Sequence, residues 1–127
     1  MATIKSYTDI EQSKKLAEIL PFESADMYYS KHDTIYADTL YDSCDIHFFY
    51  IRGYTPCWSL AALLNILHNK TKDIPILSDG GYKAGKYTSD WCFDYEFENG
   101  DYERTFADNP VDACYNMIVR LQDLNLL

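Results

Sequence analysis

The pair Asn99-Gly100 lies between two runs of alternating residues, and this pattern constrains the fold more than any other in the chain. Residues 91–98 read Trp-Cys-Phe-Asp-Tyr-Glu-Phe-Glu, and residues 101–106 read Asp-Tyr-Glu-Arg-Thr-Phe. A two-residue type I′ turn needs positive φ at both central positions, which Asn and Gly adopt readily. The sequence therefore predicts a β-hairpin with Glu98 opposite Asp101.

This predicted register gives the hairpin two different faces, because side chains alternate along a strand. The aromatic face is expected to pack under helices and consists of Trp91, Phe93, Tyr95, Phe97, Tyr102, Arg104 and Phe106. The acidic face consists of Asp94, Glu96, Glu98, Asp101 and Glu103. Like charges directly opposite each other destabilise a sheet, as Glu96 and Glu103 would. The acidic face must therefore lie in water or meet a positive charge.

Three helices are expected from their start signals. Thr8 and Glu11 form a capping-box pattern that predicts a helix over residues 9–19, ended by Pro21. Thr55-Pro56 reads as the cap and first residue of an apolar, buried helix over residues 57–68. Asp108-Asn109-Pro110 predicts the start of a last, amphipathic helix.

Shorter patterns predict further strands over residues 34–41, 46–51 and 74–77, and a loop over residues 78–89. The element order favours a single α+β domain over residues 1–127. In this domain a small antiparallel or mixed sheet, with its C-terminal β-hairpin, packs against about three helices.

The charge is strongly acidic and uneven. The net charge of the chain is −9, and residues 89–127 hold nine acids and two arginines, a net of −7. This balance argues against direct nucleic-acid binding, which needs clustered Lys and Arg, and allows a basic protein partner or a solvated surface. No apolar stretch could export the chain or span a membrane, and the four cysteines are dispersed, so we expect a cytoplasmic protein with reduced thiols.

Cys57 raises an enzymatic alternative, because a thiol in the first turn of a helix can have a lowered pKa. The string Cys57-Trp58-Ser59-Leu60-Ala61 also resembles the nucleophile helix of papain-like cysteine proteases. A base would have to be His47 or His32, since His68 lies on the same helix. The other interpretation is that Cys57 is a buried structural residue.

Two further motifs do not predict a metal or a cofactor. A possible ligand cluster comprises Asp42, Cys44, Asp45 and His47, but one His among scattered acids is usually structural or solvated. Residues 80–86 match the spacing G-x-x-x-x-G-K, yet Tyr87 follows where a phosphate-binding loop needs Ser or Thr, and no helix pattern begins there.

Four strings together resemble an uncharacterised family of short acidic proteins of gut bacteria and their phages or mobile elements. They are Thr8 to Pro21, Glu23 to Met27, Pro56 to Leu63 and Asp108 to Cys114. The family has no established activity, so the resemblance implies only a cytosolic accessory protein.

The sequence therefore favours a non-enzymatic accessory factor that binds a basic protein through the acidic face of the hairpin. The alternative is a cysteine-dependent enzyme or thiol switch that uses Cys57. A homo-oligomer joined through an uncovered aromatic surface is a third possibility, and the pattern does not decide the oligomeric state.

Overall fold

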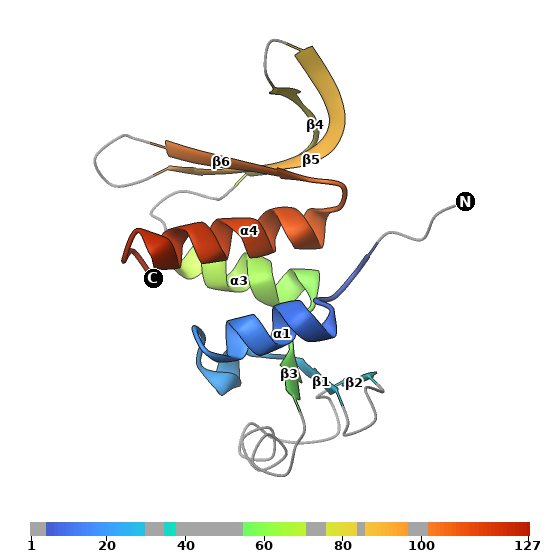
Figure 1. The fold of residues 1–127 in the computed structure, drawn as a ribbon, viewed down its shortest axis with the longest axis vertical. Coiled ribbons are helices and arrows are strands. Elements are labelled where there is room, and N and C mark those ends of the chain that lie inside the picture. Colours follow the sequence, from blue (N-terminus) through green and yellow to red (C-terminus); the bar gives the residue numbers. More distant parts are fainter. Residues whose placement is uncertain (1–4, 30–34, 38–54, 71–75, 84–85, 97–101) are drawn as a thin grey trace. The chain divides into compact units, whose positions relative to one another are not determined.

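A computed structural model describes residues 5–29, 35–37, 55–70, 76–83, 86–96 and 102–127 (Figure 1). The fold class is α+β, as the sequence predicts, and the strands form two antiparallel sheets of three strands each. The described residues fall into two compact units. We call residues 7–62 the N-terminal unit, and residues 63–127 with residues 1–6 the C-terminal unit. That the chain folds as one domain stays a prediction.

The N-terminal unit is a short helix beside a small sheet. Its elements are α1 (Ile10–Ala17), the 3-10 turn η1 (Phe22–Ser24), β1 (Met27–Tyr29), β2 (Ile35–Ala37) and β3 (Thr55–Cys57). Strand β1 is central and pairs with both others, so that Met27 lies opposite Ala37 and Cys57. Its core buries Leu16, Leu20, Ala25, Tyr28, Tyr29, Cys57 and Trp58.

Helix α1 begins one residue later than its capping pattern indicates. The cap is Asp9, whose Oδ1 accepts the Gln12 backbone N–H at 2.8 Å, while the Gln12 side chain accepts the Asp9 N–H at 3.1 Å. The prediction of Thr8 with Glu11 is therefore wrong. Thr8 is buried instead, and its hydroxyl binds groups in the unit's core.

The helix expected from Cys57 begins later too. Residues Thr55–Cys57 form β3, and α3 runs over Leu60–Lys70. Ser59 caps α3, since its Oγ accepts the Ala62 N–H at 3.2 Å. Asp26 in turn accepts the Ser59 N–H at 2.9 Å and the Ser59 hydroxyl. Thr55-Pro56 is therefore not the start of the helix, because pairing of β3 with β1 outweighs the local signal.

The C-terminal unit consists of a long antiparallel sheet with a helix across it. Its strands are β4 (Ile76–Lys83), β5 (Lys86–Glu96) and β6 (Tyr102–Ala107), in the order β4-β5-β6. Helix α4 (Pro110–Asp123) packs on β5 and β6, as Figure 1 shows. The expected loop over residues 78–89 is wrong, because most of it pairs as β4 and β5, with an irregularity between Asp79 and Gly81.

Helix α4 begins at its predicted Asn-Pro signal and ends with a left-handed residue. Asn109 Oδ1 accepts the Asp112 N–H at 2.8 Å, and Pro110 begins the helix. At the other end the Leu126 N–H reaches the Leu121 carbonyl at 2.9 Å, with Asn125 at φ 58°. This is the Schellman geometry, in which Asn tolerates the left-handed position. The buried residues of α4 are Pro110, Val111, Ala113, Cys114, Met117, Ile118 and Leu121.

Helix α3 buries Leu63, Ile66 and Leu67. The strand expected over residues 46–51 lies outside the described residues. Within the part of the chain that the structure describes, no helix combines the length and apolar character needed to cross a membrane.

Candidate functional site

The hairpin β5–β6 exists, but its register differs by one residue from the predicted one. Asp94 lies opposite Arg104, and Glu96 lies opposite Tyr102. A shift of one residue moves every side chain of one strand to the other side of the sheet. We therefore define an inner face of Trp91, Phe93, Tyr95, Glu103, Thr105 and Ala107, and an outer face of Cys92, Asp94, Glu96, Tyr102, Arg104 and Phe106.

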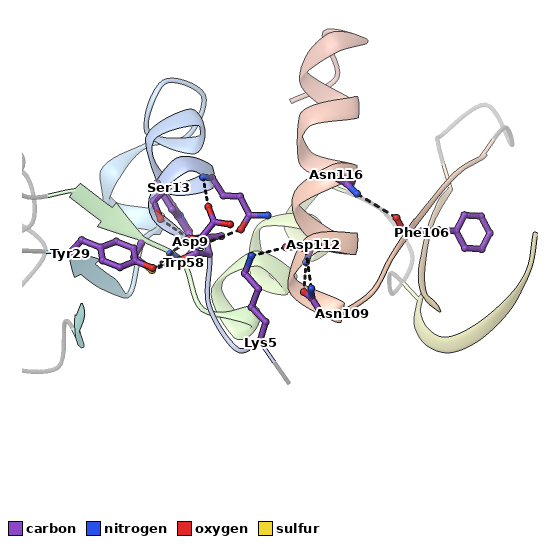
Figure 2. A network of polar contacts seen from close by, with 12 residues as sticks. Lys5, Asp9, Ser13, Tyr29, Trp58, Phe106, Asn109, Asp112 and Asn116 are labelled. Carbon is purple, nitrogen blue, oxygen red and sulfur yellow. Dashed lines mark hydrogen bonds and ion pairs between the residues drawn. The ribbon is translucent and has the colours of Figure 1, made fainter. Parts of the chain in front are cut away.

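The inner face is the one that α4 covers. Thr105 Oγ1 donates to the Ala113 carbonyl of α4 at 2.8 Å, and Phe93 is fully buried. On the other side, the Asn116 amide of α4 reaches only the backbone carbonyl of Phe106, at 3.4 Å. Figure 2 shows the Phe106 ring pointing away from α4. The outer face thus turns away from the helix.

The predicted aromatic face is therefore only partly correct. Phe93 and Tyr95 are buried, as expected. Tyr102 and Phe106 instead lie on the outer face, and the Tyr102 side chain is 65% exposed. Phe97 lies outside the described residues. The prediction of buried aromatic residues is therefore confirmed for β5, whereas for β6 it assigned the outer-face residues to the core.

The predicted acidic face is also divided. Asp94 and Glu96 lie on the outer face, whereas Glu103 lies on the inner face, where Arg120 Nη2 of α4 contacts its Oε1 at 3.4 Å. Glu98 and Asp101 lie outside the described residues. The three described carboxylates therefore do not share one surface, because the real register separates them.

The outer face holds a cation between an acid and an aromatic ring. Arg104 Nε forms an ion pair with Asp94 Oδ1, and its Cζ lies 5.9 Å from the centroid of the Tyr102 ring. The hydrogen bond to Asp94 raises the pKa of Arg104 further above its usual value. A guanidinium in this position gains both from the carboxylate and from the negative face of the ring.

The accessible part of this outer face lies at one end. Glu96, Tyr102 and Arg104 are exposed, whereas Cys92 is 2% exposed. Tyr102 and Arg104 were missed as site residues because the predicted register placed them in the core. The one signal was Arg104 itself, a charge that does not belong on a buried aromatic face.

Cys57 lies in a buried polar cluster at the end of β3, together with Thr8, Ser13 and Tyr29. Figure 2 shows Ser13 and Tyr29 of this cluster. The Cys57 Sγ donates to the Thr8 carbonyl at 3.4 Å and lies 3.5 Å from the Thr8 hydroxyl. The Tyr29 hydroxyl donates to the same Thr8 carbonyl at 2.7 Å. The Thr8 and Ser13 hydroxyls are hydrogen-bonded at 2.8 Å. The cluster joins α1, β1 and β3.

The environment of Cys57 is unfavourable for a nucleophile. The residue is 0% exposed, and burial raises the pKa of its thiol. Because Cys57 ends a strand and α3 begins at Leu60, the expected placement in a first helical turn is wrong. The candidate bases His32 and His47 lie outside the described residues. The described geometry therefore fits the structural interpretation of Cys57.

The other motifs are located as follows. Asp42, Cys44, Asp45 and His47 lie outside the described residues, and among the described ones no three His, Cys, Asp or Glu side chains gather as cation ligands would. Of the motif over residues 80–86, residues 80–83 lie on β4 and Lys86 begins β5, while residues 84 and 85 lie outside the described residues. The described backbone after it continues as a strand, whereas a phosphate-binding loop leads into a helix.

Comparison of the chain with protein-family models, with curated proteins and with solved structures found no match.

Proposed function

We propose that this protein is a non-enzymatic binding protein that docks a basic protein partner on the outer face of the β5–β6 hairpin. The observation that carries the proposal is the exposure of Glu96 and Tyr102 on a sheet face that α4 leaves uncovered. This face belongs to a segment, residues 89–127, with a net charge of −7. The acidic segment attracts a basic surface, and the exposed face offers it contacts.

The resemblance to short acidic proteins of phages and mobile elements adds the expectation that the partner belongs to a host. The buried, hydrogen-bonded thiol of Cys57 argues against the enzymatic alternative, because a thiol without access to solvent cannot meet a substrate.

The proposal is tested with a fluorescent peptide of alternating Lys and Gly, whose binding is followed by anisotropy. Two variants carry the same charge change within one unit: Glu96→Lys on the outer face, and Asp108→Lys, which is exposed directly after β6. We expect Glu96→Lys to weaken binding about fivefold and Asp108→Lys less than about twofold, because charge acts mainly within a Debye length of about 10 Å and Asp108 lies about 20 Å along the extended strand from Tyr102. Raising NaCl from about 50 mM to about 300 mM should weaken all complexes.

Equal effects of the two variants would show that only the total charge matters, and the outer face would lose its role. Wild-type protein that fails to bind the peptide at low salt would refute the proposal altogether. Circular dichroism of both variants checks that their helices remain folded.

A further inference from the structure

We infer that the exposed Tyr102 ring is the docking point for arginine side chains of the basic partner. Arg104 of the same chain occupies this position when no partner is bound. The inference rests on the proposed function and specifies its central contact. It follows from the geometry around one ring, which lies at the accessible end of the outer face.

Tyr102 has acidic positions beside it on the neighbouring strand. Glu96 lies directly opposite Tyr102, and Asp94 lies diagonally across, opposite Arg104. In an antiparallel pair, side chains in directly opposite and in diagonal positions are both close enough to interact. The ring therefore stands among carboxylates, and a cation above it can contact the ring and an acid at once.

Arg104 already demonstrates this form of binding. Its guanidinium lies 5.9 Å from the Tyr102 ring centroid and is paired with Asp94. Both partners of the ion pair are partly exposed, with side-chain exposures of 39% for Arg104 and 25% for Asp94. Solvent-exposed ion pairs are weak, so an incoming guanidinium can displace Arg104 at small cost.

Arginine fits this position better than lysine. A planar guanidinium stacks on an aromatic face and offers several fixed donors to a carboxylate, whereas an ammonium is a strongly hydrated point charge. A second copy of this chain, with a net charge of −9, would be repelled. The charge of the surface therefore favours an arginine-bearing segment as the occupant.

The test uses dye-labelled hexa-arginine and hexa-lysine peptides and four variants. Tyr102→Ala removes the ring and should weaken hexa-arginine binding about fivefold, whereas Tyr102→Phe keeps the ring and should bind like wild type. Arg104→Gln removes the residue that occupies the position and should strengthen binding about threefold or more. Arg120→Gln is the matched control, since it removes an equal charge from the pair with Glu103 on the inner face.

The outcomes separate a failure of this inference from a failure of the proposed function. If Arg104→Gln and Arg120→Gln strengthen binding equally, or if Tyr102→Ala binds like wild type, the inference is refuted while binding of basic peptides still supports the proposed function. If hexa-lysine shows the same dependence on Tyr102 as hexa-arginine, the preference for arginine is refuted. If wild type binds neither peptide, both proposals fail.

Discussion

Replacing Thr8 by Val should strongly destabilise the N-terminal unit, although the two side chains have nearly the same shape. Thr8 is fully buried, and its hydroxyl accepts the Trp58 backbone N–H at 3.2 Å and contacts the Ser13 hydroxyl at 2.8 Å. Val fills the same space, so no cavity forms and only the hydrogen bonds are lost. The variant therefore isolates the contribution of a buried hydroxyl.

The expected loss of stability follows from two groups, the Trp58 N–H and the Ser13 hydroxyl. The third group at the Thr8 hydroxyl, Cys57 Sγ, keeps its hydrogen bond to the Thr8 carbonyl. The Trp58 N–H becomes a buried donor without its acceptor, which costs about 1–3 kcal/mol. The Ser13 hydroxyl can instead donate to the backbone carbonyl one helical turn earlier. Losing its hydrogen bond to Thr8 therefore costs less, about 0.5–1 kcal/mol. We expect Thr8→Val to lower the unfolding free energy by about 1.5–4 kcal/mol in total. Ser13→Ala should cost about 1 kcal/mol less in the Thr8→Val background than in the wild type.

Urea unfolding followed by Trp58 fluorescence measures this effect, with Trp91→Phe as the common background so that one tryptophan reports. With an m-value of about 2 kcal/mol/M, the middle of the range for small proteins, the midpoint should fall by about 1–2 M. A change within about 0.5 kcal/mol is typical of neutral surface substitutions and would show that the buried cluster does not stabilise the unit.

Three further changes test other parts of the fold. Asp26→Ala should destabilise by about 1–2 kcal/mol in the same urea assay, because the Ser59 N–H at the start of α3 loses its acceptor. Asn125→Gly should raise, and Asn125→Ala should lower, the unfolding free energy by about 0.5–1 kcal/mol each, measured as opposite shifts of the thermal midpoint, since Asn125 has φ 58°. Burial raises the pKa of Cys114 to about 12 from 9.0, so the folded state keeps a proton that the unfolded state loses. The contribution of Cys114 to the unfolding free energy should therefore be constant below pH 9.0 and fall by up to about 1.4 kcal/mol per pH unit between pH 9.0 and about 12, so that the unfolding free energy falls less steeply with pH in Cys114→Ala; equal slopes in both proteins would contradict this.

The sequence predicted the elements that have strong local signals. Helix α4, with its Asn-Pro start and apolar stripe, was expected where it lies, and α1 differs by one capping residue. The prediction was wrong where tertiary contacts decide. Residues 55–57 form a strand because β1 offers them a partner, and Asp26, far away in sequence, helps to set the start of α3 at Leu60.

The candidate site could be predicted in part only, because it depends on strand register. The sequence identified the hairpin and the acids of β5, but it assigned Tyr102 and Arg104 to the core. The Asn-Gly signal favours a two-residue connection and the register that follows from it, whereas the structure pairs Glu96 with Tyr102. A local turn preference is worth less than the packing of a whole strand face against α4.

Electrostatics gives a physical reason for the observed register, and the reason is readable in the sequence. The predicted register places Glu96 opposite Glu103, and like charges in directly opposite positions repel. The observed register replaces this pair by Asp94 opposite Arg104 and brings Glu103 within 3.4 Å of Arg120 on α4. A shift of one residue thus converts one repulsive contact into two attractive ones. Comparing the cross-strand charge pairs of neighbouring registers would have rejected the predicted register, with Arg104 as the deciding residue, but a shift in the other direction would place Glu96 opposite Arg104 and remove the repulsion equally well.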